Sequence, residues 1–192
     1  MLIYAHRGAS RDFPELTESA YQAAVSEGAD GFECDVRLSR DEVPVLWHNA
    51  SMLERAGNRG LIAEMTFDQI KQAYPQVLTL NDFLDIAIQH SKGVLIETKH
   101  PVISGTRIEE IVVQILRDRK VVSKINTSVM SFSWSAIEKL HRIAPEIPTT
   151  LLLSHRLRFI QARFSSATTI APGIELIRRD PSLIRKIKDL GK

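Results

Sequence analysis

The sequence predicts an α/β protein in which parallel strands alternate with helices, as in a (β/α) barrel. Two observations lead to this prediction. Short apolar runs alternate with longer amphipathic stretches along all 192 residues, which is the pattern of repeated strand-helix units. Acidic residues and histidines stand inside or directly after several of the apolar runs. Side chains at the carboxyl ends of barrel strands line the barrel mouth, where barrel active sites lie.

Six apolar runs are predicted to be barrel strands: 2–5, 31–36, 94–99, 127–132, 148–153 and 167–171. The run at 43–47 is predicted to be an extra hairpin arm. An eight-stranded barrel usually takes about 250 residues and rarely fewer than about 200. The sequence therefore predicts a barrel that lacks its last two strand-helix units.

Helices are predicted between these strands from apolar periodicity and from capping residues. A first helix covers 17–27 and ends at Gly28, and a small helical insertion lies around 50–92. Another helix covers Pro181–Leu190. The residues predicted to cap helices are Thr66 with Gln69, Asn81, Thr106 with Glu109, and Ser135 with Glu138.

Composition favours one ordinary globular domain over residues 1–192, with 44% hydrophobic and 25% charged residues. The net charge of +2 gives no sign of nucleic-acid binding, although residues 1–100 are acidic and the rest are basic. No apolar run approaches the ~20 residues of a membrane span. The single cysteine, Cys34, cannot form an internal disulfide. Without a signal-peptide pattern, a cytoplasmic location is predicted.

Three carboxylates are the candidate metal ligands. Glu33 and Asp35 lie two residues apart on a predicted strand, so both face one side while Cys34 faces the other. Glu97 repeats this arrangement with Lys99 on the next core strand. Oxygen ligands suit a hard cation, either Mg²⁺ or Ca²⁺. The alternative is a solvated strand face, but the apolar flanks of these pairs favour buried strands.

Histidines and cations at the strand ends are candidates for acid-base chemistry and phosphate binding. His6 and Arg7 directly follow the first strand, and His48 directly follows the 43–47 run. Imidazole titrates near neutral pH, so His6 and His48 can serve as general acid and base. Arg7 and Lys99 can hold a phosphate group. The alternative for each histidine is a structural, hydrogen-bonded residue; His100 is expected either in such a role or at the rim of the site.

These motifs together resemble the glycerophosphodiester phosphodiesterase family, in its bacterial, cytoplasmic type. The resemblance covers nearly the whole chain, with short motifs in the family's order and spacing. They are Ala5-His6-Arg7-Gly8-Ala9-Ser10, Pro14-Glu15-Leu16-Thr17, Gly28-Ala29-Asp30-Gly31-Phe32-Glu33-Cys34-Asp35-Val36, Val43-Pro44-Val45-Leu46-Trp47-His48, Ile96-Glu97-Thr98-Lys99, Ser131-Phe132 and Ile170-Ala171-Pro172.

The resemblance implies a TIM-type barrel that hydrolyses glycerophosphodiesters, which are small-molecule substrates, to glycerol 3-phosphate and an alcohol. It assigns the acid-base pair to His6 and His48, a divalent cation to Glu33, Asp35 and Glu97, and phosphate contacts to Arg7 and Lys99. In the family, a glycerol hydroxyl attacks the phosphorus, and water then opens the cyclic phosphate.

Three departures from the family pattern keep alternatives open. Leu16 stands where the family usually has asparagine, and Asn49 stands where it usually has aspartate after the histidine. The chain also stops where the family continues into further strands. One alternative is a degenerate, weakly active or inactive barrel that acts as a binding module. Another is a phospholipase D-like enzyme of the same fold.

The predicted strand count also has a consequence for assembly. A closed barrel has no edge strands, because its last strand pairs with its first. With six core strands, the first and sixth strands keep unpaired backbone groups, and such edges favour pairing with another chain. Two outcomes follow: the basic segments 155–163 and 178–188 cover the gap, or two chains associate around it. The sequence favours the second, homo-oligomers formed through the open barrel edge, because helices cannot easily pair with strand backbone groups.

Overall fold

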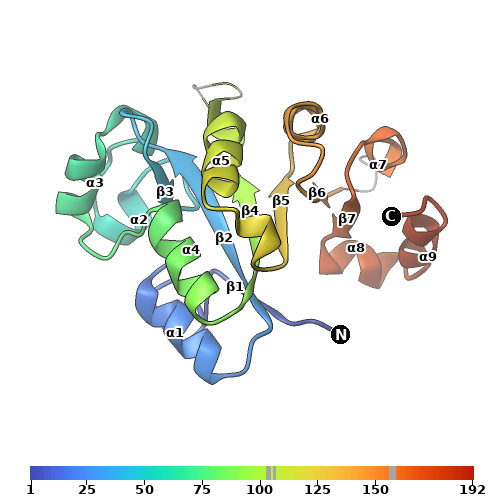
Figure 1. Cartoon of the computed structure of the whole chain (residues 1–192), viewed down its shortest axis with the longest axis horizontal. Coiled ribbons are helices and arrows are strands. Elements are labelled where there is room, and N and C mark those ends of the chain that lie inside the picture. Colours follow the sequence, from blue (N-terminus) through green and yellow to red (C-terminus); the bar gives the residue numbers. More distant parts are fainter. Residues whose placement is uncertain (103–104, 106, 156–158) are drawn as a thin grey trace. The chain divides into compact units, whose positions relative to one another are not determined.

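The computed structural model describes residues 1–102, 105, 107–155 and 159–192. The chain divides into two compact units, Met1–Thr127 and Ser128–Lys192. Strands and helices alternate in both units, as the sequence predicts (Figure 1). All six predicted barrel strands are present among the described residues. No helix of the described part is both long and apolar enough to cross a membrane.

In the first unit, the long strand β2 (Gly31–Leu38) lies between two parallel partners, β1 (Tyr4–His6) and β4 (Gly93–Thr98). A short strand, β3 (Pro44–Leu46), pairs with β2 in the antiparallel sense. It lies within the predicted hairpin arm at 43–47, which is thereby confirmed. The register places His6 opposite Glu33 and Asp35 opposite Glu97, so polar side chains gather at the carboxyl ends of these strands.

The helices of the first unit follow the predicted order. They are α1 (Glu18–Ser26), α2 (Leu53–Ala56), the 3₁₀ helix η1 (Ile62–Glu64), α3 (Phe67–Ala73), α4 (Leu80–Gln89), α5 (Arg107–Asp118) and the 3₁₀ helix η2 (Val121–Ser123). The helices α2 to α4 with η1 form the helical insertion predicted around 50–92.

Helix caps are where the sequence predictions and the structure differ most. The capping box of Thr66 and Gln69 is confirmed at the start of α3. The predicted cap at Asn81 is wrong, because Thr79 has the extended backbone of an N-cap and forms a capping box with Asp82. The predicted cap at Ser135 is wrong for the same reason, since Ser133 caps α6 (Trp134–Ile143). The box predicted at Thr106 lies outside the described residues.

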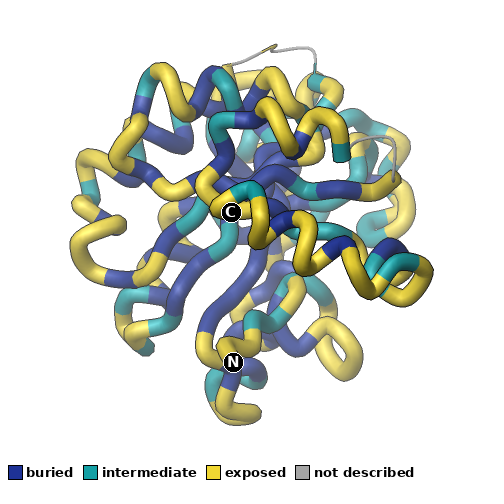
Figure 2. Tube along the Cα trace, turned by 90° about the vertical axis from the view of Figure 1, so that its right-hand side faces the viewer, coloured by how far each residue is buried: buried dark blue, intermediate teal, exposed yellow. Residues whose placement is uncertain are grey.

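The two sides of β2 face different surroundings. Phe32 and Cys34 are fully buried, and the Phe32 ring packs against Tyr21 of α1 and Phe83 of α4, with centroids 5.2 and 6.3 Å away. The alternate residues Glu33 and Asp35 point to the other side, as strand geometry requires. The tube in Figure 2 is dark blue wherever the chain is buried, and residues 31–36 of β2 are all buried. The apolar side thus anchors β2, and its polar side is left for the site.

The amino-terminal ends of β1, β2 and β4 approach one another closely at two glycines. A methyl group at Gly31 would lie 2.3 Å from the Tyr4 ring and 2.6 Å from the Gly93 carbonyl oxygen. One at Gly93 would lie 2.8 Å from the Tyr4 hydroxyl. Only glycine fits at such distances, so these residues let the Tyr4 ring lie against β2 and β4.

The second unit repeats the parallel pattern. Strand β6 (Thr149–Leu153) pairs with β5 (Thr127–Ser131) on one side and with β7 (Thr169–Pro172) on the other, both in parallel. Its helices are α6 (Trp134–Ile143), α7 (Phe159–Phe164), α8 (Ile174–Arg179) and α9 (Ser182–Lys188). The last of them confirms the basic helix predicted over Pro181–Leu190.

Candidate active site

The three predicted metal ligands lie together in the first unit. Glu33 and Asp35 come from β2 and Glu97 comes from β4, and these residues are 6%, 0% and 7% exposed. One carboxylate oxygen of each lies within 4.8 Å of the others. Strand alternation puts Glu33 and Asp35 on one face, and the β2–β4 register sets Glu97 opposite Asp35. The sequence therefore predicted this convergence correctly.

Two cations lie against these carboxylates. The Arg7 Nε atom is 2.9 Å from Asp35 Oδ2. The Lys99 Nζ atom is 3.2 Å from Asp35 Oδ1 and 2.7 Å from Glu97 Oε1. Two positive side chains thus face three acidic ones, and both cations belong to the predicted phosphate-binding pair.

The ionised form of this carboxylate cluster is disfavoured by burial and by the repulsion between its members. Burial, and then the nearby Asp35 and Glu97, raise the pKa of Glu33 to about 8. Burial also raises the pKa of Glu97, against the opposing effect of Lys99. Three buried carboxylate oxygens are a donor set that a hard divalent cation prefers, and a cation would relieve their repulsion. The residues present therefore fit a divalent cation.

The turn after β1 places Arg7. Its backbone is left-handed, with φ of 59°, and its N–H lies 3.1 Å from Glu33 Oε2 and 3.2 Å from the Glu33 carbonyl oxygen. The next residue, Gly8, also has a positive φ, and a methyl group there would lie 2.7 Å from Ala20. Local strain of this kind persists only where the surroundings fix it. Here the Glu33 contacts and the start of α1 fix it.

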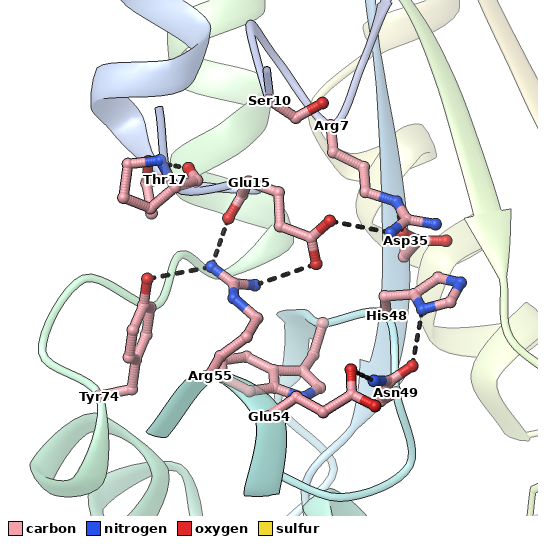
Figure 3. A network of polar contacts seen from close by, with 12 residues as sticks. Arg7, Ser10, Glu15, Thr17, Asp35, His48, Asn49, Glu54, Arg55 and Tyr74 are labelled. Atoms are coloured by element: carbon pink, nitrogen blue, oxygen red, sulfur yellow. Dashed lines mark hydrogen bonds and ion pairs between the residues drawn. The ribbon is translucent and has the colours of Figure 1, made fainter. Parts of the chain in front are cut away.

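A second arginine, Arg55, supports Arg7 through Glu15 (Figure 3). One oxygen of Glu15 accepts from Arg7 Nη1 at 2.8 Å, and the other lies 3.7 Å from Arg55 Nη1. Arg55 also donates to the Glu15 carbonyl and, at 3.0 Å, to the Tyr74 hydroxyl. Its guanidinium lies 4.6 Å from the Trp47 ring centroid and 4.9 Å from that of Tyr74.

The sequence did not predict a role for Glu15 or Arg55. Glu15 stands in one of the family-like motifs, which is a usable signal. Arg55 gave none, because it contacts a residue 40 positions away along the chain. Leu16, the residue after Glu15, is only 1% exposed and has a left-handed φ of 58°. Asparagine adopts this backbone conformation more readily than leucine does. Leucine in place of the family's asparagine therefore gains a buried apolar side chain at the cost of a less favourable backbone.

The two candidate acid-base residues have different surroundings. The His6 side chain is 67% exposed, and its Nε2 lies 3.8 Å from Glu33 Oε2. Partial desolvation and the charge of Arg7 lower the pKa of His6, and His48 contributes in the same direction. The two imidazoles are therefore close enough to interact electrostatically. His48 is half-buried, and its Nδ1 lies 2.7 Å from Asn49 Oδ1.

The structure resolves the two alternatives for His100. Its Nε2 lies 2.7 Å from Oε1 of Glu109, which is fully buried on α5. His100 therefore has the structural, hydrogen-bonded role, and its ring is directed at α5. Of the predicted site residues, His6, Arg7, Glu33, Asp35, Glu97 and Lys99 are joined by the contacts above, and His48 adjoins them.

Comparison with known proteins decides the family. The model of the glycerophosphoryl diester phosphodiesterase family matches residues 6–192. The chain belongs to this family. It is thus a phosphodiesterase of the hydrolase class with a TIM-type barrel fold, as the sequence predicted. A probable glycerophosphodiester phosphodiesterase 1 of Mycobacterium tuberculosis is 31% identical over 99% of this chain and 78% of its own.

Solved structures support the phosphodiesterase fold. A glycerophosphodiester phosphodiesterase from Agrobacterium tumefaciens is 26% identical, with a TM-score of 0.78 over 100% of this chain and 84% of its own. An Oleispira antarctica phosphodiesterase, in complex with the product sn-glycerol-3-phosphate, is 22% identical with a TM-score of 0.83. The match covers 100% of this chain and 81% of that one.

Proposed function

We propose that this phosphodiesterase hydrolyses glycerophosphodiesters to glycerol 3-phosphate and an alcohol, in a reaction that depends on a divalent cation. The observation that carries the proposal is the buried cluster of Glu33, Asp35 and Glu97 with Arg7 and Lys99 against it. Burying three carboxylates costs free energy unless positive groups or a metal ion compensate their charge. The related Oleispira antarctica enzyme, with its bound sn-glycerol-3-phosphate, supports the same product class.

Glu33, Asp35 and Glu97 would hold the cation, Mg²⁺ or Ca²⁺. When bound, such a cation polarises a hydroxyl and a phosphoryl oxygen and offsets the charge of the phosphate. Arg7 and Lys99 already neutralise part of the carboxylate charge. With a cation bound to the carboxylates, Lys99 Nζ and the Arg7 N–H groups that do not bind Glu15 would be available to phosphate oxygens, which ammonium and guanidinium groups bind well.

His6 and His48 move the protons. One imidazole takes the proton from the glycerol hydroxyl as its oxygen attacks phosphorus. The other gives a proton to the oxygen of the leaving alcohol as its bond to phosphorus breaks. When water opens the resulting cyclic phosphate, the two roles are exchanged. Glu15 and Arg55 hold the Arg7 guanidinium in place during both steps.

Hydrolysis of glycerophosphocholine by the whole chain, with and without EDTA, tests the proposal. We expect glycerol 3-phosphate to be released, EDTA to stop the release, and Mg²⁺ or Ca²⁺ to restore it. An inactive barrel would release nothing under any of these conditions. A phospholipase D-like enzyme would instead cleave a sphingomyelin substrate and leave glycerophosphocholine intact.

We further propose that both units belong to one barrel domain over residues 1–192, because one family model spans both of them. Homo-oligomers through an open barrel edge, and a cytoplasmic location, stay predictions from the sequence. Light scattering coupled to gel filtration tests the first. A mass above 21.6 kDa that falls with dilution is expected, and a monomer at every concentration would contradict it.

A further inference from the structure

We propose that Glu54, acting through Asn49, holds the proton of neutral His48 on Nδ1, so that His48 Nε2 begins the reaction as the base. Glu54 and Asn49 are then positioning residues. This inference rests on the proposed function, because it assigns one of the two acid-base roles to His48. It leaves the acid role in the first step to His6.

The contacts form a chain of three side chains (Figure 3). His48 Nδ1 lies 2.7 Å from Asn49 Oδ1, and Asn49 Nδ2 donates to the Glu54 carboxylate. An amide oxygen only accepts hydrogen bonds, so the ring nitrogen that faces it must donate. In a neutral imidazole, a proton on Nδ1 leaves the lone pair on Nε2. The arrangement therefore selects one tautomer of His48.

Glu54 supplies what Asn49 alone lacks, which is a fixed orientation of the amide. If the amide turned over, its NH₂ group would face His48 Nδ1 and would require the lone pair there. The proton would then move to Nε2, and the base would be lost. The same rotation would put the amide oxygen against the Glu54 carboxylate, where neither group can donate. Glu54 thus opposes the wrong orientation.

The loop that carries these residues is fixed at several points. Arg37 Nε donates to the His48 carbonyl oxygen at 2.9 Å. The indole N–H of Trp47, a fully buried residue, donates to the Ser51 carbonyl oxygen at 3.0 Å. These contacts hold the turn between β3 and α2, so that Glu54 in the first turn of α2 stays within reach of Asn49.

The tautomer of His48 can be measured directly by ¹⁵N NMR of the whole chain, because protonated and unprotonated imidazole nitrogens have well-separated shifts. We expect Nδ1 to carry the proton in the wild type. Glu54→Lys should move it to Nε2, because an ammonium donates only and would turn the amide over. Glu54→Gln should weaken the preference for Nδ1 without reversing it, because its amide can either accept from Asn49 or donate to the turned-over amide.

Two further variants separate positioning from a general effect of charge. Glu64→Lys makes the same charge change at an exposed residue of η1, and it should leave both the tautomer and kcat unchanged. Adding Asn49→Asp to Glu54→Lys should return the proton to Nδ1, because a carboxylate at 49 accepts from the ring in either orientation. We expect kcat to fall at least tenfold in Glu54→Lys, with KM little changed, and to recover in the double variant.

The proposal is overturned if the wild type carries the proton on Nε2, or if Glu54→Lys leaves it on Nδ1. It is also overturned if Glu64→Lys shifts the tautomer as strongly as Glu54→Lys does. The NMR measurement needs no turnover. An Nδ1 proton in a wild type that hydrolyses no diester would therefore contradict the proposed function, whereas active enzyme with an Nε2 proton contradicts only the role of Glu54.

Discussion

At the scale of single residues, the site sets two histidines and two cationic side chains around three buried carboxylates. His6 is mostly exposed and touches Glu33, whereas His48 is half-buried and held by Asn49. Arg7 and Lys99 lie against the carboxylates and compensate their charge. The sequence could predict these residues because strand alternation and strand ends are local features. It could not predict Arg55 or Glu54, whose contacts depend on how the insertion folds back.

Replacing either histidine tests the acid-base assignment. We expect His6→Ala and His48→Ala each to lower kcat by ~10²–10⁴-fold, since that is the usual contribution of a positioned proton donor or acceptor. Circular dichroism should show an unchanged fold. The matched control is His141→Ala, an exposed histidine on α6, which should keep wild-type kcat. Wild-type rates in both site variants would contradict the assignment.

The raised pKa of Glu33 predicts how the metal-free and metal-bound proteins respond to pH. Burial, followed by Asp35 and Glu97, raises the pKa of Glu33 from 4.5 in the unfolded chain to about 8 in the folded protein without a cation. The folded state therefore binds more protons between these values, and the metal-free protein should lose stability as the pH rises from about 4.5 to about 8. Urea unfolding at several pH values, with EDTA present, measures this.

The metal-free site favours protonated Glu33, whereas a bound cation favours the ionised carboxylate. Cation affinity measured by calorimetry should therefore rise with pH and level off above about 8, with protons released on binding. Glu33→Gln should remove most of this pH dependence. An affinity that is independent of pH in the wild type would show that Glu33 is not protonated in the metal-free site.

At the scale of elements, the β1–α1 turn links the fold to the site. Arg7, Gly8 and Leu16 all have a positive φ, and the Leu16 N–H donates to the Arg7 carbonyl oxygen at 3.0 Å. The turn therefore brings the Glu15 segment beside Arg7. Sequence analysis located the strand and the helix on either side of this turn, but a left-handed backbone at Arg7 and Leu16 has no signal in residue type.

Two glycines with similar backbones separate strain from crowding in this turn. Gly8 and Gly28 have φ of 80° and 82°, so alanine at either should cost ~1–2 kcal/mol through the backbone. At Gly8 the methyl group also lies 2.7 Å from Ala20, whereas at Gly28 it has no neighbour within 4 Å in the described structure. Gly8→Ala should therefore cost ~1–3 kcal/mol more.

Chemical denaturation of the two variants gives this difference, and kcat gives its effect on the site. We expect Gly8→Ala to lose activity as well as stability, because the displaced turn moves Arg7 away from Asp35. Gly28→Ala should keep wild-type kcat. Equal losses of stability in both variants would mean that the turn relaxes around the added methyl group.

At the scale of the whole molecule, the periodic order of strands and helices was the part that sequence alone could predict. Sequence analysis predicted the six barrel strands and the extra hairpin arm, because apolar runs and the alternation of side chains reflect which residues are buried. The helix caps at Thr79 and Ser133 were missed, because several neighbouring residues can cap and only the backbone selects one. The family resemblance and the geometry agree on the carboxylate cluster, although they rest on different observations.

The central claim is that the buried carboxylates hold the cation on which hydrolysis depends. The most direct test is the rate of glycerophosphodiester hydrolysis as a function of Mg²⁺ or Ca²⁺ concentration, in the wild type and in Glu97→Gln. We use Glu64→Gln, at an exposed residue of η1, as the control. The account predicts that Glu97→Gln needs at least tenfold more cation for half-maximal rate, while the control matches the wild type. The same cation dependence in all three proteins would contradict it.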